Sequence, residues 1–256
     1  IFKKQYEKLM QNEIEIRECA TLDQLAECVQ LQRDVFQLPE VELSPVRHFI
    51  VTKNAGGFTL GAYDGDRLAG FVLSVPAFVR GEHAFYSHMT GVRSEYQSHG
   101  IGAKLKWGQR RRALSEGVKY IKWTFEPMKA RNAYFNLEKL GAIVAEYEVD
   151  FYGVDYTTAP DAKIGLASDR LIAEWHLESP KVAALAAGEK FIDDRKPEAE
   201  IVITNDWAGL VASDPAAALA EQLRIRGEFQ AAFSAGLAGR AFRRDAVRPA
   251  YLLYKD

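Results

Sequence analysis

Glycine spacing between residues 89 and 117 marks the stretch of this chain best suited to bind an anion. Gln97, Gly100 and Gly102 follow an apolar run that ends at Val92, and they precede the basic segment KLKWGQRRR. A strand followed by a tight glycine turn and a helix brings backbone N–H groups and the positive end of the helix dipole to one point. Glycine also allows the backbone to approach a phosphate closely, so we expect a phosphate or pyrophosphate site here.

The pattern Gln97-x-x-Gly100-x-Gly102-Ala103 resembles the Q/R-x-x-G-x-G/A signature of the GCN5-related N-acetyltransferases, the GNAT superfamily. The resemblance implies that the loop holds the pyrophosphate of coenzyme A (CoA) through backbone amides. The residues expected to contribute are Gln97, Ser98, His99, Gly100, Ile101, Gly102 and Ala103. The alternative is an ordinary helix N-terminus in which glycine serves close packing.

The same resemblance gives a role to the end of the preceding strand, residues Thr90, Gly91 and Val92. It implies that the backbone of this strand pairs with the pantetheine arm, as an added strand does, and that one N–H group polarises the thioester carbonyl. An ordinary central strand is the alternative. The arginines at 110–112 are expected on a solvated helix face, and one basic face on a weakly acidic chain does not indicate nucleic-acid binding.

Hydrophobic periodicity and turn residues predict the elements that position these residues. Strands are expected near residues 14–16, 58–63, 68–79, 84–92, 118–125 and 143–152, and helices near 21–37, 46–52, 99–116 and 130–140. Antiparallel hairpins followed by a β-α-β crossover are also the element order of the GNAT superfamily. We therefore expect an α/β fold of the α+β type, with a mixed, mostly antiparallel central sheet flanked by helices.

Beyond residue 157 the pattern changes, with strands expected at 171–177, 199–204 and 251–254 and a helix at 215–233. The predicted organisation is a GNAT acyltransferase domain over residues 1–177 and a C-terminal α+β extension, packed on it, over residues 178–256.

A candidate general acid comes from the segment ARNAYFNLEKLGA, which resembles a second GNAT motif at Ala133, Glu138, Lys139 and Gly141. In that motif a tyrosine protonates the leaving CoA thiolate, and this chain has Leu137 in its place. Tyr134 lies one helical turn earlier, so it either takes over as the acid or belongs to the core. Asn132 is assigned to the CoA site on the same resemblance.

An amine acceptor has to lose a proton before it attacks a thioester, so a general base is also expected. Glu126, at the end of a predicted strand, is the first candidate and His88 is the second. Their alternatives are a carboxylate paired with Arg131 and a half-buried imidazole. No hydrolase elbow or metal-ligand pattern is found, so no metal is expected.

The composition is typical of an ordinary soluble globular protein. The chain has 256 residues, 48% of them apolar, and a net charge of −2, which gives no electrostatic case for bulk nucleic-acid or membrane binding. Cys19 and Cys28 are expected as two buried thiols. Without a secretory or membrane-spanning segment, a cytoplasmic location is expected, and a homodimer is possible.

The function expected from these observations is an acyl-CoA-dependent N-acyltransferase that acts by direct attack of a primary amine of a small molecule, with amino acids among the candidate acceptors. Acetyl-CoA is the default donor on resemblance. One alternative is a succinyl-CoA-dependent amino-acid N-succinyltransferase, since the stretch WTFEPMKARNAYFNLEKLGA resembles a GNAT branch that includes enzymes acylating amino acids from succinyl-CoA. Arg131 or Arg93 would pair with the carboxylate of the donor or acceptor, or would be solvated surface residues. The other alternative is a non-catalytic CoA-binding module, because Leu137 stands where the motif has its tyrosine acid.

Overall fold

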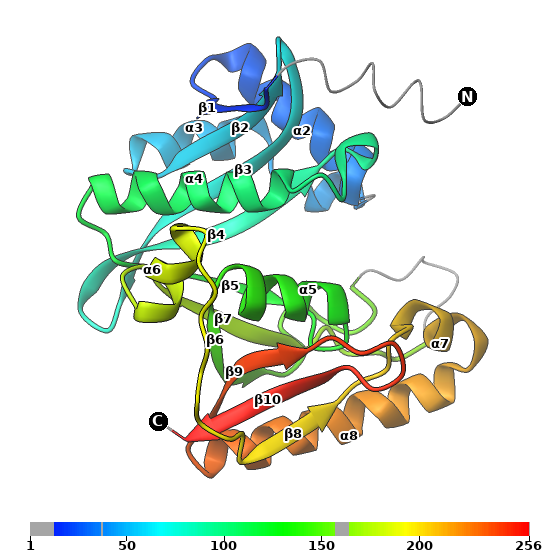
Figure 1. Ribbon diagram of the computed structural model, residues 1–256. Helices are drawn as coiled ribbons and strands as arrows, with labels where there is room; N and C mark the ends of the chain where they lie inside the picture. Colours follow the sequence, from blue (N-terminus) through cyan, green and yellow to red (C-terminus); the bar gives the residue numbers. More distant parts are fainter. Residues whose placement is uncertain (1–12, 37, 157–163, 256) are drawn as a thin grey trace, which may run out of the picture. The chain divides into compact units, whose positions relative to one another are not determined.

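The computed structural model describes residues 13–36, 38–156 and 164–255 (Figure 1). Contacts between residues divide the chain into two compact units that meet between Ile121 and Lys122. The boundary expected from the sequence, between residues 177 and 178, rests on a change of pattern rather than on spatial clustering, and it stays a prediction. None of the helices that the structure describes is long and apolar enough to span a lipid bilayer.

The first unit has a four-stranded antiparallel sheet in the order β1-β2-β3-β4. Its strands are β1 (Glu15–Glu18), β2 (Phe58–Asp64), β3 (Arg67–Val79) and β4 (Glu82–Val92). The helices α2 (Leu22–Phe36) and α3 (Val46–Asn54) pack on one face, while α4 (Ile101–Ser115) packs on the other (Figure 1). Short 3₁₀ turns, η1 (Glu40–Glu42) and η2 (Ser94–Tyr96), complete the connections.

Local signals explain how these elements begin and join. Thr21 and Gln24 form the expected capping box at the start of α2, because the side chain of each accepts a hydrogen bond from the other's backbone N–H (3.1 and 3.3 Å). A two-residue turn with Gly65 at φ 59° connects β2 to β3. Cys19 and Cys28 are free, buried thiols with sulfur atoms 3.9 Å apart, as expected.

The second unit has strands in the order β5-β7-β6-β9-β10-β8, and the pairs from β7 to β8 are antiparallel. The strands are β5 (Tyr120–Phe125), β6 (Ile143–Glu148), β7 (Arg170–His176), β8 (Ala199–Val202), β9 (Leu237–Arg243) and β10 (Ala250–Lys255). The helices are α5 (Ala130–Tyr134), α6 (Pro180–Ala186), α7 (Trp207–Ser213) and α8 (Pro215–Ser234). The long helix α8 packs along β6, β8 and β9.

The mixed α+β fold, with mostly antiparallel sheet flanked by helices, agrees with the expected fold class. Several predicted boundaries were wrong. The expected helix over 130–140 is α-helical only to Tyr134, and a π turn, η3 (Phe135–Lys139), follows it. The strand expected over 143–152 ends at Glu148, and the helix expected from His99 begins at Ile101, because Gly100 is left-handed and ends the preceding turn.

Candidate functional site

The glycine loop of the first unit has the backbone geometry of an anion site. Ser98 and Gly100 adopt left-handed conformations, with φ 67° and 77°. The first main-chain hydrogen bond of α4 runs from the N–H of Lys104 to the carbonyl of Gly100, at 3.0 Å. Helix geometry therefore leaves the amides of residues 101–103 without an intrahelical acceptor. A concave backbone of this kind, at a helix N-terminus with no acidic residue in its first turn, favours an oxyanion.

Glycine at position 100 serves conformation rather than packing. A Cβ added there would meet nothing within 4 Å, so space does not require glycine. The positive φ of residue 100 requires glycine, because residues with a Cβ rarely adopt this conformation. This observation argues against the close-packing alternative at Gly100.

Hydrogen bonds connect this loop to the end of β4. Thr90, Gly91 and Val92 pair with residues 70–72 of β3, and the Gln97 side chain donates to the carbonyl of Val92 at 3.1 Å. The following residue, Arg93, donates to the carbonyl of Leu68 and to the Asp34 carboxylate, at 2.8 and 2.7 Å. Because its guanidinium is committed in this way, Arg93 is a poor candidate for a substrate carboxylate.

His88 lies at an irregularity of β4. The register against β3 slips between Met89 and Ser87, so His88 is the extra residue of a bulge. Bulges often re-aim a side chain beside a functional site. The Nε2 of His88 lies 3.2 Å from the Ser44 hydroxyl, and its ring centroid lies 5.4 Å from that of His48. Although part of the residue is exposed, desolvation by its neighbours and the nearby His48 lower the pKa of His88, which keeps the imidazole neutral and able to accept a proton near pH 7.

The second unit carries Asn132, Tyr134 and Leu137 on α5 and η3. The π turn is closed by a hydrogen bond from the N–H of Leu140 to the carbonyl of Phe135, at 3.1 Å, so the expected i to i+3 relation between Tyr134 and Leu137 does not follow α-helical geometry. Leu137 is fully buried and Asn132 is exposed.

Tyr134 is half-buried, and its ring lies between two cations. The distances from the ring centroid are 5.6 Å to Lys139 Nζ and 5.4 Å to Arg244 Cζ. The electron-rich ring attracts both cations, which hold it at the edge of the core, and a half-buried ring leaves part of the side chain accessible. Because the side chain is only half-buried, the acid role and the core role of Tyr134 both stay predictions.

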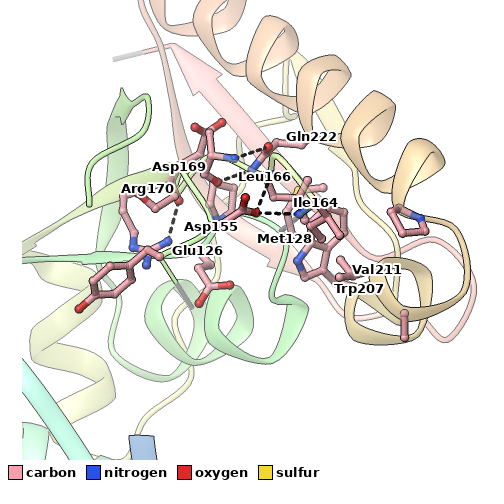
Figure 2. Close-up of a pocket in the computed structure, with 16 residues that line it drawn as sticks. Glu126, Met128, Asp155, Ile164, Leu166, Asp169, Arg170, Trp207, Val211 and Gln222 are labelled. Atoms are coloured by element: carbon pink, nitrogen blue, oxygen red, sulfur yellow. Dashed lines mark hydrogen bonds between the residues drawn. The ribbon is translucent and has the colours of Figure 1, made fainter. Parts of the chain in front are cut away.

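Glu126 follows β5 and lines a cavity of about 480 Å³ in the second unit (Figure 2). One carboxylate oxygen, Oε1, accepts a hydrogen bond from Lys129 Nζ at 2.6 Å. The alternative partner expected for Glu126, Arg131, is an exposed residue. Among the described residues the Oε2 atom of Glu126 has no hydrogen-bond partner, so this oxygen is available to a ligand.

The floor of this cavity is the segment 164–170, which two acidic side chains hold in place. The Asp155 carboxylate accepts hydrogen bonds from the backbone amides of Ile164, Gly165 and Leu166 at 3.0 to 3.2 Å. The buried Asp169 carboxylate accepts two bonds from the Arg226 guanidinium, at 2.9 and 3.0 Å.

Further contacts extend this anchoring. Tyr147 donates its hydroxyl to Asp169 at 2.7 Å, and the Gln222 amide bonds both backbone groups of Ala167. A binding surface held from several sides is preorganised, so a ligand would not have to order it.

The cavity has a polar end and an apolar end. Figure 2 shows Glu126 and Arg170 on one side, with Ile164, Met128, Trp207 and Val211 gathered on the other. Arg170 is 8% exposed and donates only to the carbonyl of Asp169, at 3.0 Å, with its guanidinium 5.0 Å from the Tyr152 ring. Within the part of the chain that the structure describes, no carboxylate pairs with Arg170.

Sequence reasoning missed this cavity. Residues 155–170 were placed in the GNAT domain over 1–177 without any role, and residues 178–256 were expected only as an extension, although Asp169 and Arg170 directly precede an apolar strand. Charged residues at the start of a buried strand were the available signal, because such side chains are rarely buried without a partner. Of the candidate residues, His88, 90–92 and 97–103 lie in the first unit, and Glu126, Asn132 and Tyr134 lie in the second.

Comparisons with known proteins bear on these features. Residues 23–142 match the model of the acetyltransferase (GNAT) family. A GNAT-family protein from Desulfovibrio desulfuricans is similar in structure, with a TM-score of 0.53 at 15% identity over 64% of this chain and 99% of that one. An acetyltransferase of the GNAT family from Streptococcus pneumoniae gives 0.50 at 16% identity, over 63% and 98%.

A chain of the NatC complex bound to Gag peptide and CoA gives a TM-score of 0.51 at 18% identity, over 65% of this chain and 99% of that one. At such identities the likeness concerns the fold. No curated protein sequence matches this chain.

Proposed function

We propose that this chain, whose residues 23–142 belong to the acetyltransferase (GNAT) family, is an acyl-CoA-dependent N-acyltransferase. The observation that carries the proposal is the loop before α4, with left-handed Ser98 and Gly100 and a helix N-terminus free of acidic residues. This is the backbone arrangement that binds a pyrophosphate without side-chain charge. The NatC structure, which shares the fold, is bound to CoA.

The residues that fit CoA are the amides of the loop over 97–103 and the backbone of the β4 end at residues 90–92, as expected from the sequence. A thioester supplies an activated acyl carbon and a leaving thiolate. The acceptor nitrogen forms a bond to that carbon, the carbon–sulfur bond breaks, and the thiol leaves as the amide product forms. An N–H group near Thr90 stabilises the oxyanion in this proposal.

Glu126 and His88 are the proposed bases for the ammonium proton. Glu126 combines a free carboxylate oxygen with a position on the cavity wall, while His88 has a lowered pKa and is therefore neutral at pH 7. A general base of either kind contributes about 10²–10⁴-fold to the rate. Tyr134 is the proposed proton donor to the thiolate.

The acceptor proposed here is a small-molecule amine, with acetyl-CoA as the default donor. One observation favours the second candidate, acylation of an amino acid. Arg170 sits at the polar end of the cavity without a carboxylate partner among the described residues, opposite an apolar wall that includes Trp207. A guanidinium of this kind pairs bidentately with a carboxylate. Arg170 therefore replaces Arg131 and Arg93 as the candidate for that contact, and succinyl-CoA is the alternative donor.

The test is release of free CoA thiol from acetyl-CoA and from succinyl-CoA, measured against amino acids and against the same amines without a carboxylate. Gly102→Glu places a negative charge in the loop and should raise KM for acyl-CoA about tenfold or more, equivalent to about 1.4 kcal/mol. Gly227→Glu, on the exposed face of α8, is the matched control and should leave KM unchanged.

Glu126→Gln and His88→Gln identify the base, because only the variant of the true base should lose about 10²–10⁴-fold in kcat. Arg170→Met should raise KM for amino acids and leave that for decarboxylated amines unaltered. Saturable CoA binding without thiol release from either donor would support the non-catalytic module instead. Absence of CoA binding would reject the proposal.

A further inference from the structure

A second cavity, of about 620 Å³, lies in the second unit among η3, β6, α6, β9 and β10. Its volume is within the usual range of small-molecule sites. Among the described residues, none lines both this cavity and the one in Figure 2. The charged residues that line it are Glu138, Lys181, Asp193, Arg195 and Arg240.

Both carboxylates of this cavity are already engaged. Glu138 Oε1 accepts a hydrogen bond from the backbone N–H of Phe242 at 2.8 Å, and Lys181 Nζ lies 3.8 Å away from it. Asp193 accepts two bonds from the Arg195 guanidinium, at 2.9 and 2.7 Å, which holds the pKa of Asp193 at about 2. Three cations therefore face two carboxylates, which leaves the lining with one excess positive charge.

The cations are also crowded and partly removed from water. The side chain of Lys181 is 17% exposed and donates to the carbonyl of Arg240 at 2.7 Å. Burial lowers the pKa of Lys181 and that of Arg240, and the positive charge of Arg195 lowers the pKa of Arg240 further. Groups whose charged form is disfavoured by desolvation and by a like charge gain stability when an anion binds between them.

Apolar and aromatic side chains form another part of the cavity lining, which also includes His176 and Ser179. Tyr254 is 5% exposed, and its ring lies 5.3 Å from Arg195 Cζ. Phe191 is 38% exposed, and Ile143 and Pro180 also belong to the lining. A ligand that fits both parts carries an oxyanion and an aromatic or apolar body.

We propose that this second cavity binds a small organic oxyanion, a carboxylate or a phosphate ester attached to an aromatic or apolar group, through Arg240 and Lys181, while Arg195 adds its positive charge and stays bonded to Asp193 and to the Lys255 carbonyl. The site is independent of the proposed acyl transfer, since it uses none of the residues assigned to CoA or to the amine. Planar guanidinium groups match the geometry of both oxyanions, and the neighbouring Phe191 and Tyr254 receive the body of the ligand.

The experiment uses benzoate, phenyl phosphate and neutral benzamide as probes, with binding to the full chain measured by titration calorimetry. Saturable binding of benzoate or phenyl phosphate, weakened at least tenfold by Arg240→Met and by Arg195→Met, is the expected result. The two oxyanions, compared side by side, distinguish a carboxylate site from a phosphate site. Benzamide should not bind measurably.

Two controls separate this site from the others. Arg170→Met and Gly102→Glu alter the cavity of Figure 2 and the glycine loop, and both variants should keep the binding event that Arg240→Met weakens, with unchanged affinity. If Arg240→Met does not unfold cooperatively, the test rests on Arg195→Met, whose side chain is half exposed. No saturable binding of either oxyanion, equal binding of benzamide, or loss of binding only in the control variants would overturn the proposal.

Discussion

At the scale of single residues, Lys106 shows how burial alters a side chain inside the helix that follows the glycine loop. Its Nζ is buried and lies 3.0 Å from the Ser87 hydroxyl and 2.8 Å from the Gln109 side-chain oxygen. Burial lowers the pKa of Lys106 well below its ordinary value. Gln109 in turn donates to the Ser74 hydroxyl at 2.8 Å, so a polar network runs through the core of the first unit.

The lowered pKa predicts how stability depends on pH. In the unfolded chain Lys106 titrates near pH ~10.4, so below that value the unfolded state holds a proton that the folded state binds less readily. Lower pH therefore favours unfolding. The loss of stability caused by burying Lys106 disappears as the pH rises toward about 10. The difference in free energy of unfolding between the unmodified chain and Lys106→Met should rise with pH, by up to about 1.4 kcal/mol per unit.

Urea unfolding at several pH values measures this difference, and subtracting the variant removes the contributions of other groups. Lys104→Met is the control, because Lys104 is exposed two residues earlier on the same helix. The difference in free energy of unfolding between the unmodified chain and Lys104→Met should not change with pH. A flat difference for Lys106→Met as well would show that the amine stays protonated in the folded chain.

Sequence reasoning at this scale succeeds where backbone conformation determines the residue type. The positive φ of Gly100 follows from a pattern of neighbours along the chain, so it is readable from the sequence. Arg170 was not identified, because its importance depends on Trp207 and Glu126, which lie far from it in the sequence and line the same cavity only in the fold. No pattern of neighbouring residues in the sequence indicates that distant side chains come together in the fold.

At the scale of elements, replacing glycine by alanine should have opposite effects on stability at two helix positions. A Cβ at Gly108 in α4 would lie 2.8 Å from Ile16 Cγ2 of β1, whereas a Cβ at Gly227 in α8 would meet nothing within 4 Å. Gly108→Ala should lower the free energy of unfolding by about 1–3 kcal/mol through overpacking. Gly227→Ala should raise it by about 0.5–1 kcal/mol, because alanine loses less backbone entropy.

Chemical denaturation of both variants beside the unmodified chain measures this contrast. Each substitution adds the same methyl group inside a helix, so each serves as the control for the other. Stabilisation by Gly108→Ala would mean that α4 moves away from β1 at little cost, and destabilisation by Gly227→Ala would mean that the exposed face of α8 is occupied.

An element can be predicted from the sequence when the contacts that form it join residues close together along the chain. The start of α2 is fixed by Thr21 and Gln24, three residues apart, and it was predicted. Helix α6 was missed although Pro180 occupies its first turn and Gly188 follows it, which is a usable local signal. The π turn at 135–139 and strand β9 depend on long-range contacts, such as that between Glu138 and Phe242, and no local pattern encodes them.

At the scale of the whole molecule, ligand binding should appear as an increase in thermal stability. A ligand that binds only the folded chain stabilises it by about 2.7 kcal/mol at a hundred times its Kd. For a protein of about this length each kcal/mol shifts Tm by roughly 2–4 °C, so CoA at that concentration should raise Tm by about 5–10 °C. Gly102→Glu should remove most of this shift, and Gly227→Glu should retain it.

The same measurement with two ligands decides whether the glycine loop and the second cavity are separate sites. Benzoate at a hundred times its own Kd should add its own shift to that of CoA, because independent sites stabilise the folded chain additively. A combined shift no larger than that of CoA alone would mean that benzoate competes for the glycine loop. Loss of the benzoate increment in Arg240→Met, with the CoA increment intact, would place the two ligands on different residues of one folded chain.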